Sequence, residues 1–173
     1  MPLHLKRITF QSIRVQTQPE PKLLENSWLV FAPCESDDYS NCVLFAQIKA
    51  LKSQEDQKSA VLGLKKLIQV AALGQQLKVH YDSKQCHELH EFKYKGKKRV
   101  IWRIRHGDIR LPFYYGHGKL IFLAGALSKR QDKLSKAEEL TLEKEVKRYI
   151  DAEKKGELLL EPESSGTSSP SRR

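Results

Sequence analysis

Three arginines, Arg103, Arg105 and Arg110, stand in one short stretch of the chain, and their chemistry suits phosphate groups. A guanidinium is always charged, and its planar fork of N–H donors matches the oxygens of a phosphate. The surrounding residues predict two strands joined by a tight turn at 106–108, and this hairpin would place the arginines on one polar face. The stretch therefore predicts a surface that holds phosphates.

The positive charge of the chain is concentrated in the same region. The 173 residues carry a formal net charge of +10. Between Phe92 and Lys136, thirteen basic residues stand against two acidic ones, so this segment holds the whole surplus. Such a field favours a polyanionic partner, nucleic acid before membrane, because no stretch approaches the roughly 18 apolar residues that span a bilayer. A basic face that is merely solvated is the alternative.

Composition and length favour one domain in a reducing compartment. Apolar residues make up 39% of the chain, enough for a core at this length. The cysteines Cys34, Cys42 and Cys86 are odd in number and show no paired spacing, and the first residues lack the apolar run of a signal peptide. We therefore expect a cytoplasmic protein.

The first half of the chain predicts strands followed by two helices. Residues 3–17 alternate loosely and favour a strand or a hairpin, and residues 28–32 form a short apolar run before Pro33 that predicts a buried strand. Apolar positions then recur with helical spacing in two groups, Leu44, Ile48 and Leu51, then Val61, Leu64, Ile68 and Ala71 or Ala72. Ser53 with Asp56 predicts the N-terminal cap of the second helix. The two helices should form a hairpin.

The second half predicts a sheet and a last helix. Residues 100–105 and 109–115 alternate between apolar and polar side chains, and 120–127 is an apolar run that suits a central strand. The short connections predict antiparallel pairing. Ser135 with Glu138 predicts the cap of a helix that ends near Lys155.

These elements predict an α+β fold in which the helical hairpin packs on one face of a twisted antiparallel sheet. We expect an N-terminal extension over residues 1–26, a domain over 27–156, and a disordered tail of Ser, Pro and Gly over 157–173.

The order of these elements and motifs resembles the RelE/ParE superfamily of toxins from type II toxin–antitoxin systems, and most of all its phage-associated HigB-like branch. Three motifs carry the resemblance, namely Trp102-Arg103-Ile104-Arg105, Ile109-Arg110-Leu111-Pro112-Phe113 and Leu127-Ser128-Lys129-Arg130. It covers about residues 28–149. The resemblance implies a RelE-like fold and a ribosome-dependent mRNA interferase, in which a ribose 2′-hydroxyl attacks the adjacent phosphate of translated mRNA.

By matched position, the resemblance implies catalytic roles for Arg103, Arg110 and Arg130, with Arg105 beside them. The start of the last helix has no tyrosine of the kind that some members place there, so His106 is the best candidate for a general acid or base. Other cations are expected to contact RNA, and they are Lys95, Lys97, Lys98, Lys129, Lys133 and Lys136.

The implied partners are the ribosome with its mRNA and a cognate antitoxin that carries a helix-turn-helix domain. We expect no cofactor and no metal ion, since Cys86, His87 and His90 match no zinc spacing. Two alternatives stay open. One is a ParE-type inhibitor of DNA gyrase, and the other is a phage nucleic-acid-binding protein without catalysis.

Overall fold

A single sheet of eight strands organises the chain, for which the computed structural model describes residues 1–128 and 133–162. The strand order is β3-β4-β5-β6-β2-β1-β8, and β7 pairs with β5 outside this path. The strands are β1 Leu3–Arg7, β2 Leu29–Cys34, β3 Cys86–Tyr94, β4 Lys97–His106, β5 Ile109–Gly116, β6 Leu120–Leu123, β7 Leu127–Ser128 and β8 Leu158–Leu160.

The sheet is mixed, so the prediction of a purely antiparallel sheet is wrong for two pairings. Strands β3 to β6 form an antiparallel meander joined by tight turns, as expected from their short connections. Strand β2 pairs with β6 in parallel, and β1 pairs with β8 in parallel. These partners are far apart in the sequence, and the rule that short turns make antiparallel pairs does not apply to them.

The apolar run at 120–127 is broken into two strands, β6 and β7, where a single strand was predicted. The break faces Pro112 of β5, whose carbonyl oxygen accepts a hydrogen bond from the Ala124 N–H at 2.9 Å. In a strand, the N–H and the C=O of one residue point to the same neighbouring strand. Proline has no N–H, so Pro112 cannot donate the second hydrogen bond of this pairing. Pairing resumes only at Leu127 with Arg110. This irregularity sets the path of the chain next to the arginines.

The two predicted N-terminal caps, at Ser53 and Ser135, mark helix starts in the structure. The helical hairpin consists of α1 (Val43–Lys49) and α2 (Gln54–Ala72), followed by a short 3-10 helix at Leu77–Val79. The Ser53 hydroxyl accepts a hydrogen bond from the Asp56 N–H at 3.0 Å. The last helix is α3 (Lys136–Lys155), and its capping box between Ser135 and Glu138 is complete.

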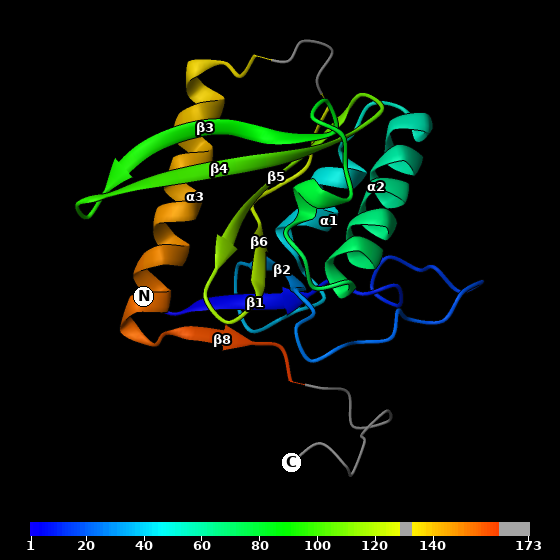
Figure 1. The fold of residues 1–173 in the computed structure, drawn as a ribbon, viewed down its shortest axis with the longest axis horizontal. Helices are drawn as coiled ribbons and strands as arrows, with labels where there is room; N and C mark the ends of the chain where they lie inside the picture. Colours follow the sequence, from blue (N-terminus) through cyan, green and yellow to red (C-terminus); the bar gives the residue numbers. More distant parts are fainter. Residues whose placement is uncertain (129–132, 163–173) are drawn as a thin grey trace.

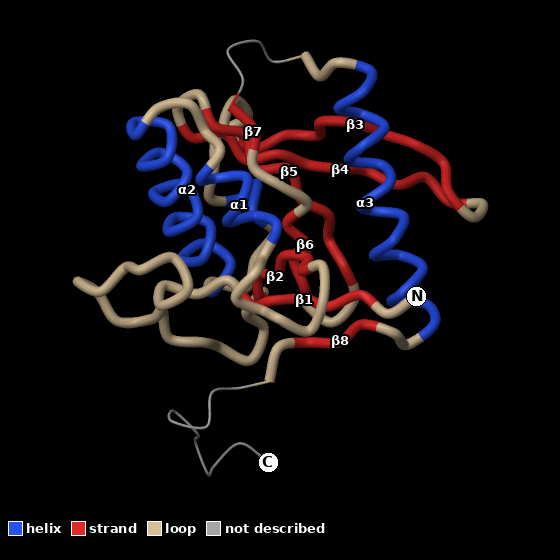
Figure 2. The backbone as a smooth tube through the Cα atoms, turned by 180° about the vertical axis from the view of Figure 1, so that it is seen from behind, coloured by secondary structure: helices blue, strands red, loops and turns tan. Residues whose placement is uncertain are grey.

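The sheet lies between two helical layers (Figures 1 and 2). Helices α1 and α2 cover one face, where side chains such as Leu64 and Leu67 pack with Leu111 and Phe113. This confirms the predicted packing of the helical hairpin. Helix α3 covers the other face, and its Val146 and Tyr149 belong to a second core cluster.

Both ends of the described chain belong to the sheet. Strand β1 lies between β2 and β8, and Ile8 and Phe10 just after it are buried, so the N-terminal segment supplies sheet and core. The prediction of disorder from residue 157 is wrong for 157–162. There, β8 pairs with β1, and Glu161 forms an ion pair with Lys6 at 2.9 Å. The rest of the predicted tail, 163–173, lies outside the described residues.

Candidate nucleic-acid interface

The hairpin of β4 and β5 brings three arginines to one face of the sheet. Arg103 pairs with Pro112, and Arg105 pairs with Arg110. Directly paired residues share a face, and so do alternate residues along a strand. Arg103, Arg105 and Arg110 therefore lie on the face that α3 covers further along the same strands.

Two of these arginines are buried, which corrects the prediction that they lie on an open polar face. Arg103 is 2% exposed and Arg110 is 4% exposed. The Arg103 guanidinium donates to the Lys84 carbonyl at 3.1 Å, and the Arg110 guanidinium donates to the Gly107 carbonyl at 3.0 Å. Burial of a charge is costly unless the group is hydrogen-bonded or paired, and backbone carbonyls accept some of the guanidinium N–H groups here. Arg105 is partly exposed.

His106 lies on the opposite face from the arginines, so the predicted neighbourhood of His106 and this cluster is wrong. It alternates with Arg105 and shares the face of Trp102 and Ile104, against α2. A Cβ built on Gly63 of α2 would lie 3.0 Å from the His106 Cβ, which shows how closely the helix approaches. Burial, and then the charge of Lys66, hold the pKa of His106 below its ordinary value.

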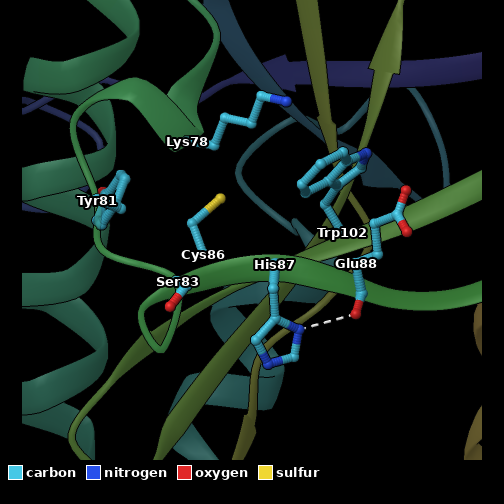
Figure 3. Close-up of a pocket in the computed structure, with 7 residues that line it drawn as sticks. All are labelled: Lys78, Tyr81, Ser83, Cys86, His87, Glu88 and Trp102. Carbon is cyan, nitrogen blue, oxygen red and sulfur yellow. Dashed lines mark hydrogen bonds between the residues drawn. The ribbon is translucent and has the colours of Figure 1, made fainter.

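His87 of β3 takes the position next to the arginines instead. It pairs with Arg103 across the β3–β4 ladder, and its Nε2 lies 2.5 Å from the Arg103 guanidinium. Its Nδ1 lies 2.8 Å from the Glu88 carbonyl, so Nδ1 carries the proton and Nε2 accepts from Arg103. In Figure 3, His87 points to the opposite side of β3 from Cys86 and Glu88. Sequence reasoning missed this residue, although alternation along β3 would have been a signal.

The predicted RNA-binding lysines of the β3–β4 hairpin are all exposed, and two of them form ion pairs. Lys95 forms an ion pair with Asp151 of α3 at 2.8 Å, and Lys98 forms one with Glu91 at 3.1 Å. The pKa of Asp151 is held below its ordinary value by Lys95 first, and then by a hydrogen bond from the Tyr94 hydroxyl. Lys97 is exposed at the tip of the β3–β4 hairpin.

The remaining predicted cations follow β7. Lys133 and Lys136 are exposed at the start of α3. Lys129 and Arg130 lie outside the described residues. The chain is nevertheless placed next to the arginines just before them, because Leu127 pairs with Arg110.

A shallow pocket of about 530 Å³ lies beside β3 (Figure 3), and its lining includes Lys78, Tyr81, Cys86, Glu88 and Trp102. The Trp102 ring meets Tyr115 edge-on with centroids 6.0 Å apart, and it packs against the core under α2. Burial raises the pKa of the Cys86 thiol to about 11 even though Arg103 opposes the shift, so this thiol is protonated at neutral pH and is a poor nucleophile.

In the part of the chain that the structure describes, His, Cys, Asp and Glu side chains nowhere gather in a group of three that could hold a metal ion. Over the same residues, no helix combines the length and the apolar character needed to cross a membrane.

Comparison of the chain with protein-family models, with curated proteins and with solved structures gave no match. Functional inference therefore depends on the residues and their geometry.

Proposed function

We propose that this chain is a toxin of the RelE/ParE type that cleaves mRNA on the ribosome. The observation that carries the proposal is the gathering of Arg103, Arg105 and Arg110 on one face of a hydrogen-bonded strand pair, with His87 in contact with Arg103. The helical hairpin on one face of the sheet is the coarse arrangement that the sequence resemblance led us to expect.

The proposed reaction needs fixed cations and a proton carrier. The ribose 2′-oxygen bonds to the adjacent phosphorus, and the bond from phosphorus to the 5′-oxygen breaks. A base takes the 2′-hydroxyl proton and an acid gives a proton to the 5′-oxygen, so the products are a cyclic phosphate and a 5′-hydroxyl end. Negative charge grows on the phosphate oxygens, and preorganised positive groups stabilise it.

The burial of the arginines divides their roles in this proposal. Arg105, with Lys133 and Lys136, would contact the RNA backbone, because these side chains reach solvent. Arg103 and Arg110 would act through their positive potential, which is weakly screened inside the protein. Arg103 would also fix the orientation of His87, to which it donates.

His87 replaces His106 as the proposed general acid or base, a role in which its Nε2 exchanges the hydrogen bond from Arg103 for one with a ribose oxygen. It is partly exposed on the arginine face, whereas His106 lies against α2 on the other face. An imidazole changes its protonation state near neutral pH, which suits proton transfer to and from ribose oxygens.

The same burial favours a second function, a nucleic-acid-binding protein without catalysis. Arg103 and Arg110 donate to backbone carbonyls and lie 2% and 4% exposed, as structural arginines do. In that case the exposed lysines would hold the nucleic acid, and no arginine would meet a reacting phosphate.

A toxin requires a neutralising partner, so the proposal includes an antitoxin with a helix-turn-helix domain. An acidic segment of such a partner would be attracted by the basic β3–β4 hairpin and by the start of α3, since complementary charge speeds association.

The test adds purified protein to translating ribosomes and maps the 5′ ends of the transcripts. We expect cuts within translated codons, a loss of about 100-fold or more in Arg105→Ala and His87→Gln, and near-normal activity in His106→Gln. Thermal unfolding of each variant separates lost chemistry from lost fold. No cleavage by the stable wild-type protein would overturn the proposal. RNA binding without cleavage would support the second function.

A further inference from the structure

Two cysteines that are separated in the sequence face each other at the end of β2. Cys34 is the last residue of β2, and Cys42 is the residue that precedes α1. The two form an isolated antiparallel bridge. Both are free thiols, and each is 2% exposed.

The bridge places them at a separation that suits a disulfide. Residues directly opposite each other in an antiparallel pair have Cα atoms about 4.5–5.5 Å apart, and their side chains leave the sheet on the same side. Disulfides span Cα separations of about 4.4–6.8 Å. Each cysteine also affects the pKa of the other, as expected for neighbouring thiols.

We propose that Cys34 and Cys42 form an intramolecular disulfide when the protein meets a small-molecule disulfide as oxidant. One cysteine thiolate attacks the oxidant and releases one small thiol, giving a mixed disulfide. The other cysteine thiolate then attacks the protein sulfur of that mixed disulfide and releases the second small thiol. The two cysteines are oxidised, the oxidant is reduced to two thiols, and the two cysteine protons pass to the released thiolates.

Cys86 is the natural internal control. It is buried at the start of β3, with Lys78, Tyr81 and Trp102 around its pocket, and it forms no part of the bridge. The pairing is therefore specific, and the expected product is one disulfide and one free thiol per chain.

The disulfide would fasten α1 to the sheet. Cys42 directly precedes α1, and Gln47 in α1 accepts a hydrogen bond from the Ala126 N–H at 2.9 Å. Ala126 leads directly into β7, which pairs with Arg110. Closing the short loop of residues 35–41 would thus reduce the freedom of the segment that adjoins the arginine face.

The reaction should be slow at neutral pH. Burial, followed by the neighbouring Cys42, raises the pKa of Cys34 to about 12, with Lys6 of β1 opposing the shift and Glu161 adding to it. Burial also raises the pKa of Cys42. The thiolate is the attacking species, so the rate of oxidation should rise about tenfold for each pH unit between about 7 and 9.

The experiment incubates the full chain with oxidised glutathione, alkylates the remaining thiols under denaturing conditions, and measures the mass of the tryptic peptide 23–49, which contains both cysteines. We expect this peptide to lose two hydrogens and to resist alkylation, while Cys86 is alkylated. The Cys86→Ala protein should behave like the wild type, and Cys34→Ala and Cys42→Ala should each keep two thiols and give no linked peptide. The oxidised wild type should melt about 5–10 °C higher than the reduced form.

Two results would overturn the inference. One is a folded wild-type protein that keeps all three thiols alkylatable after prolonged oxidation at raised pH. The other is a linked product that contains Cys86. An oxidised protein that melts lower than the reduced form would contradict the claim that the native geometry accepts the bond.

Discussion

The sheet face that carries α3 has two parts of opposite character, although the same two strands build both. Under α3, Ile101 and Tyr114 belong to an apolar cluster with Val146 and Tyr149. At the other end of β4 and β5, the same face carries the three arginines. Side chains alternate in the same way in both parts, but different groups pack against them. Helix α3 supplies apolar contacts to one part. In the other part, backbone carbonyls accept hydrogen bonds from the guanidinium groups of Arg103 and Arg110.

This difference shows that burial alone does not tell a core position from a candidate functional one. Arg103 is as inaccessible as its apolar neighbours, yet its position depends on a few directed hydrogen bonds. The apolar part should be sensitive to volume, because interiors are closely packed. The arginine part should be sensitive to the loss of donors and charge.

The largest effect is expected from Gly116→Ala in the apolar part. A Cβ at this position would lie within 2.8 Å of the Tyr149 ring carbon Cζ and closer still to its hydroxyl. Tyr149 is fully buried and cannot move aside, so we expect the free energy of unfolding in urea to fall by about 3 kcal/mol.

The control for that change is Gly118→Ala in the following turn. No atom lies within 4 Å of a Cβ there, and only the left-handed backbone, φ +70°, resists the substitution. A loss of about 1 kcal/mol is expected. Equal losses for the two variants would mean that α3 does not pack tightly on this part of the face.

The next largest effect is expected from Arg103→Ala in the arginine part. The change leaves the Lys84 carbonyl and His87 without their donor, so the free energy of unfolding should fall by about 2 kcal/mol. Arg105→Ala, at a partly exposed position, should cost about 0.5 kcal/mol or less. Arg103→Met keeps a long side chain and removes the charge, so it separates the effect of side-chain volume from that of charge. If Met restores full stability, the arginine is retained for a reason other than folding.

A smaller and pH-dependent effect is expected at the junction of α3 with β3. His90 lies 2.6 Å from the Glu143 carboxylate, and this hydrogen bond, with help from Lys147, holds the pKa of Glu143 below its ordinary value of 4.5. A depressed folded-state pKa contributes stability that is present above the unfolded value and is lost as pH falls through the folded value.

Glu143→Gln should therefore lower the melting temperature at pH 6, and the difference from the wild type should shrink as the pH falls below about 4. The matched control is Glu145→Gln, whose partner on the same helix is Arg148 at 3.1 Å in an exposed pair. Parallel pH profiles for wild type and Glu143→Gln would rule out this contribution.

The smallest effects are expected for the lysines of the β3–β4 hairpin. Lys97 is exposed, whereas Lys95 is tied to Asp151 of α3. Lys97→Ala should reduce the salt dependence of binding to single-stranded RNA by about one phosphate contact, and Lys95→Ala by less. Fluorescence anisotropy of a labelled RNA across a salt series measures both slopes. A larger reduction of the salt dependence in Lys95→Ala than in Lys97→Ala would place Lys95 in the RNA-binding surface rather than in the α3 junction.

The sequence predicted those parts of the fold that depend on local chemistry. Ser53 and Ser135 mark the helix starts because a cap is made within four residues. The turn after His106 is equally local. The parallel pairings of β2 with β6 and of β1 with β8 could not be predicted in this way, because they join segments separated by helices.

The candidate site was predicted in part, for a similar reason. Alternation correctly gathered Arg103, Arg105 and Arg110, and the same alternation, applied strictly, would have assigned His106 to the face of Trp102 and Ile104. The burial of Arg103 depends on the Lys84 carbonyl and on His87, which approach from β3 and the loop before it. No pattern within β4 and β5 contains that information.

The pairing of β1 with β8 has a topological consequence. Leu3 lies opposite Leu158, the amino terminus forms an ion pair with Glu157 at 3.3 Å, and Glu161 forms one with Lys6 at 2.9 Å, so the parallel pairing places residue 1 at the start of β8 and residue 162 beyond its end. A linker that runs back along β8, a span of roughly 15–20 Å at about 3.3 Å per residue, would join residue 162 to residue 1 and close the backbone into a ring without moving a strand. New ends could then be opened at Gly96, where the hairpin turn is exposed and no atom crowds the backbone. The fold is thus suited to circular permutation, which would change the order of its strands along the chain and leave their order in the sheet intact.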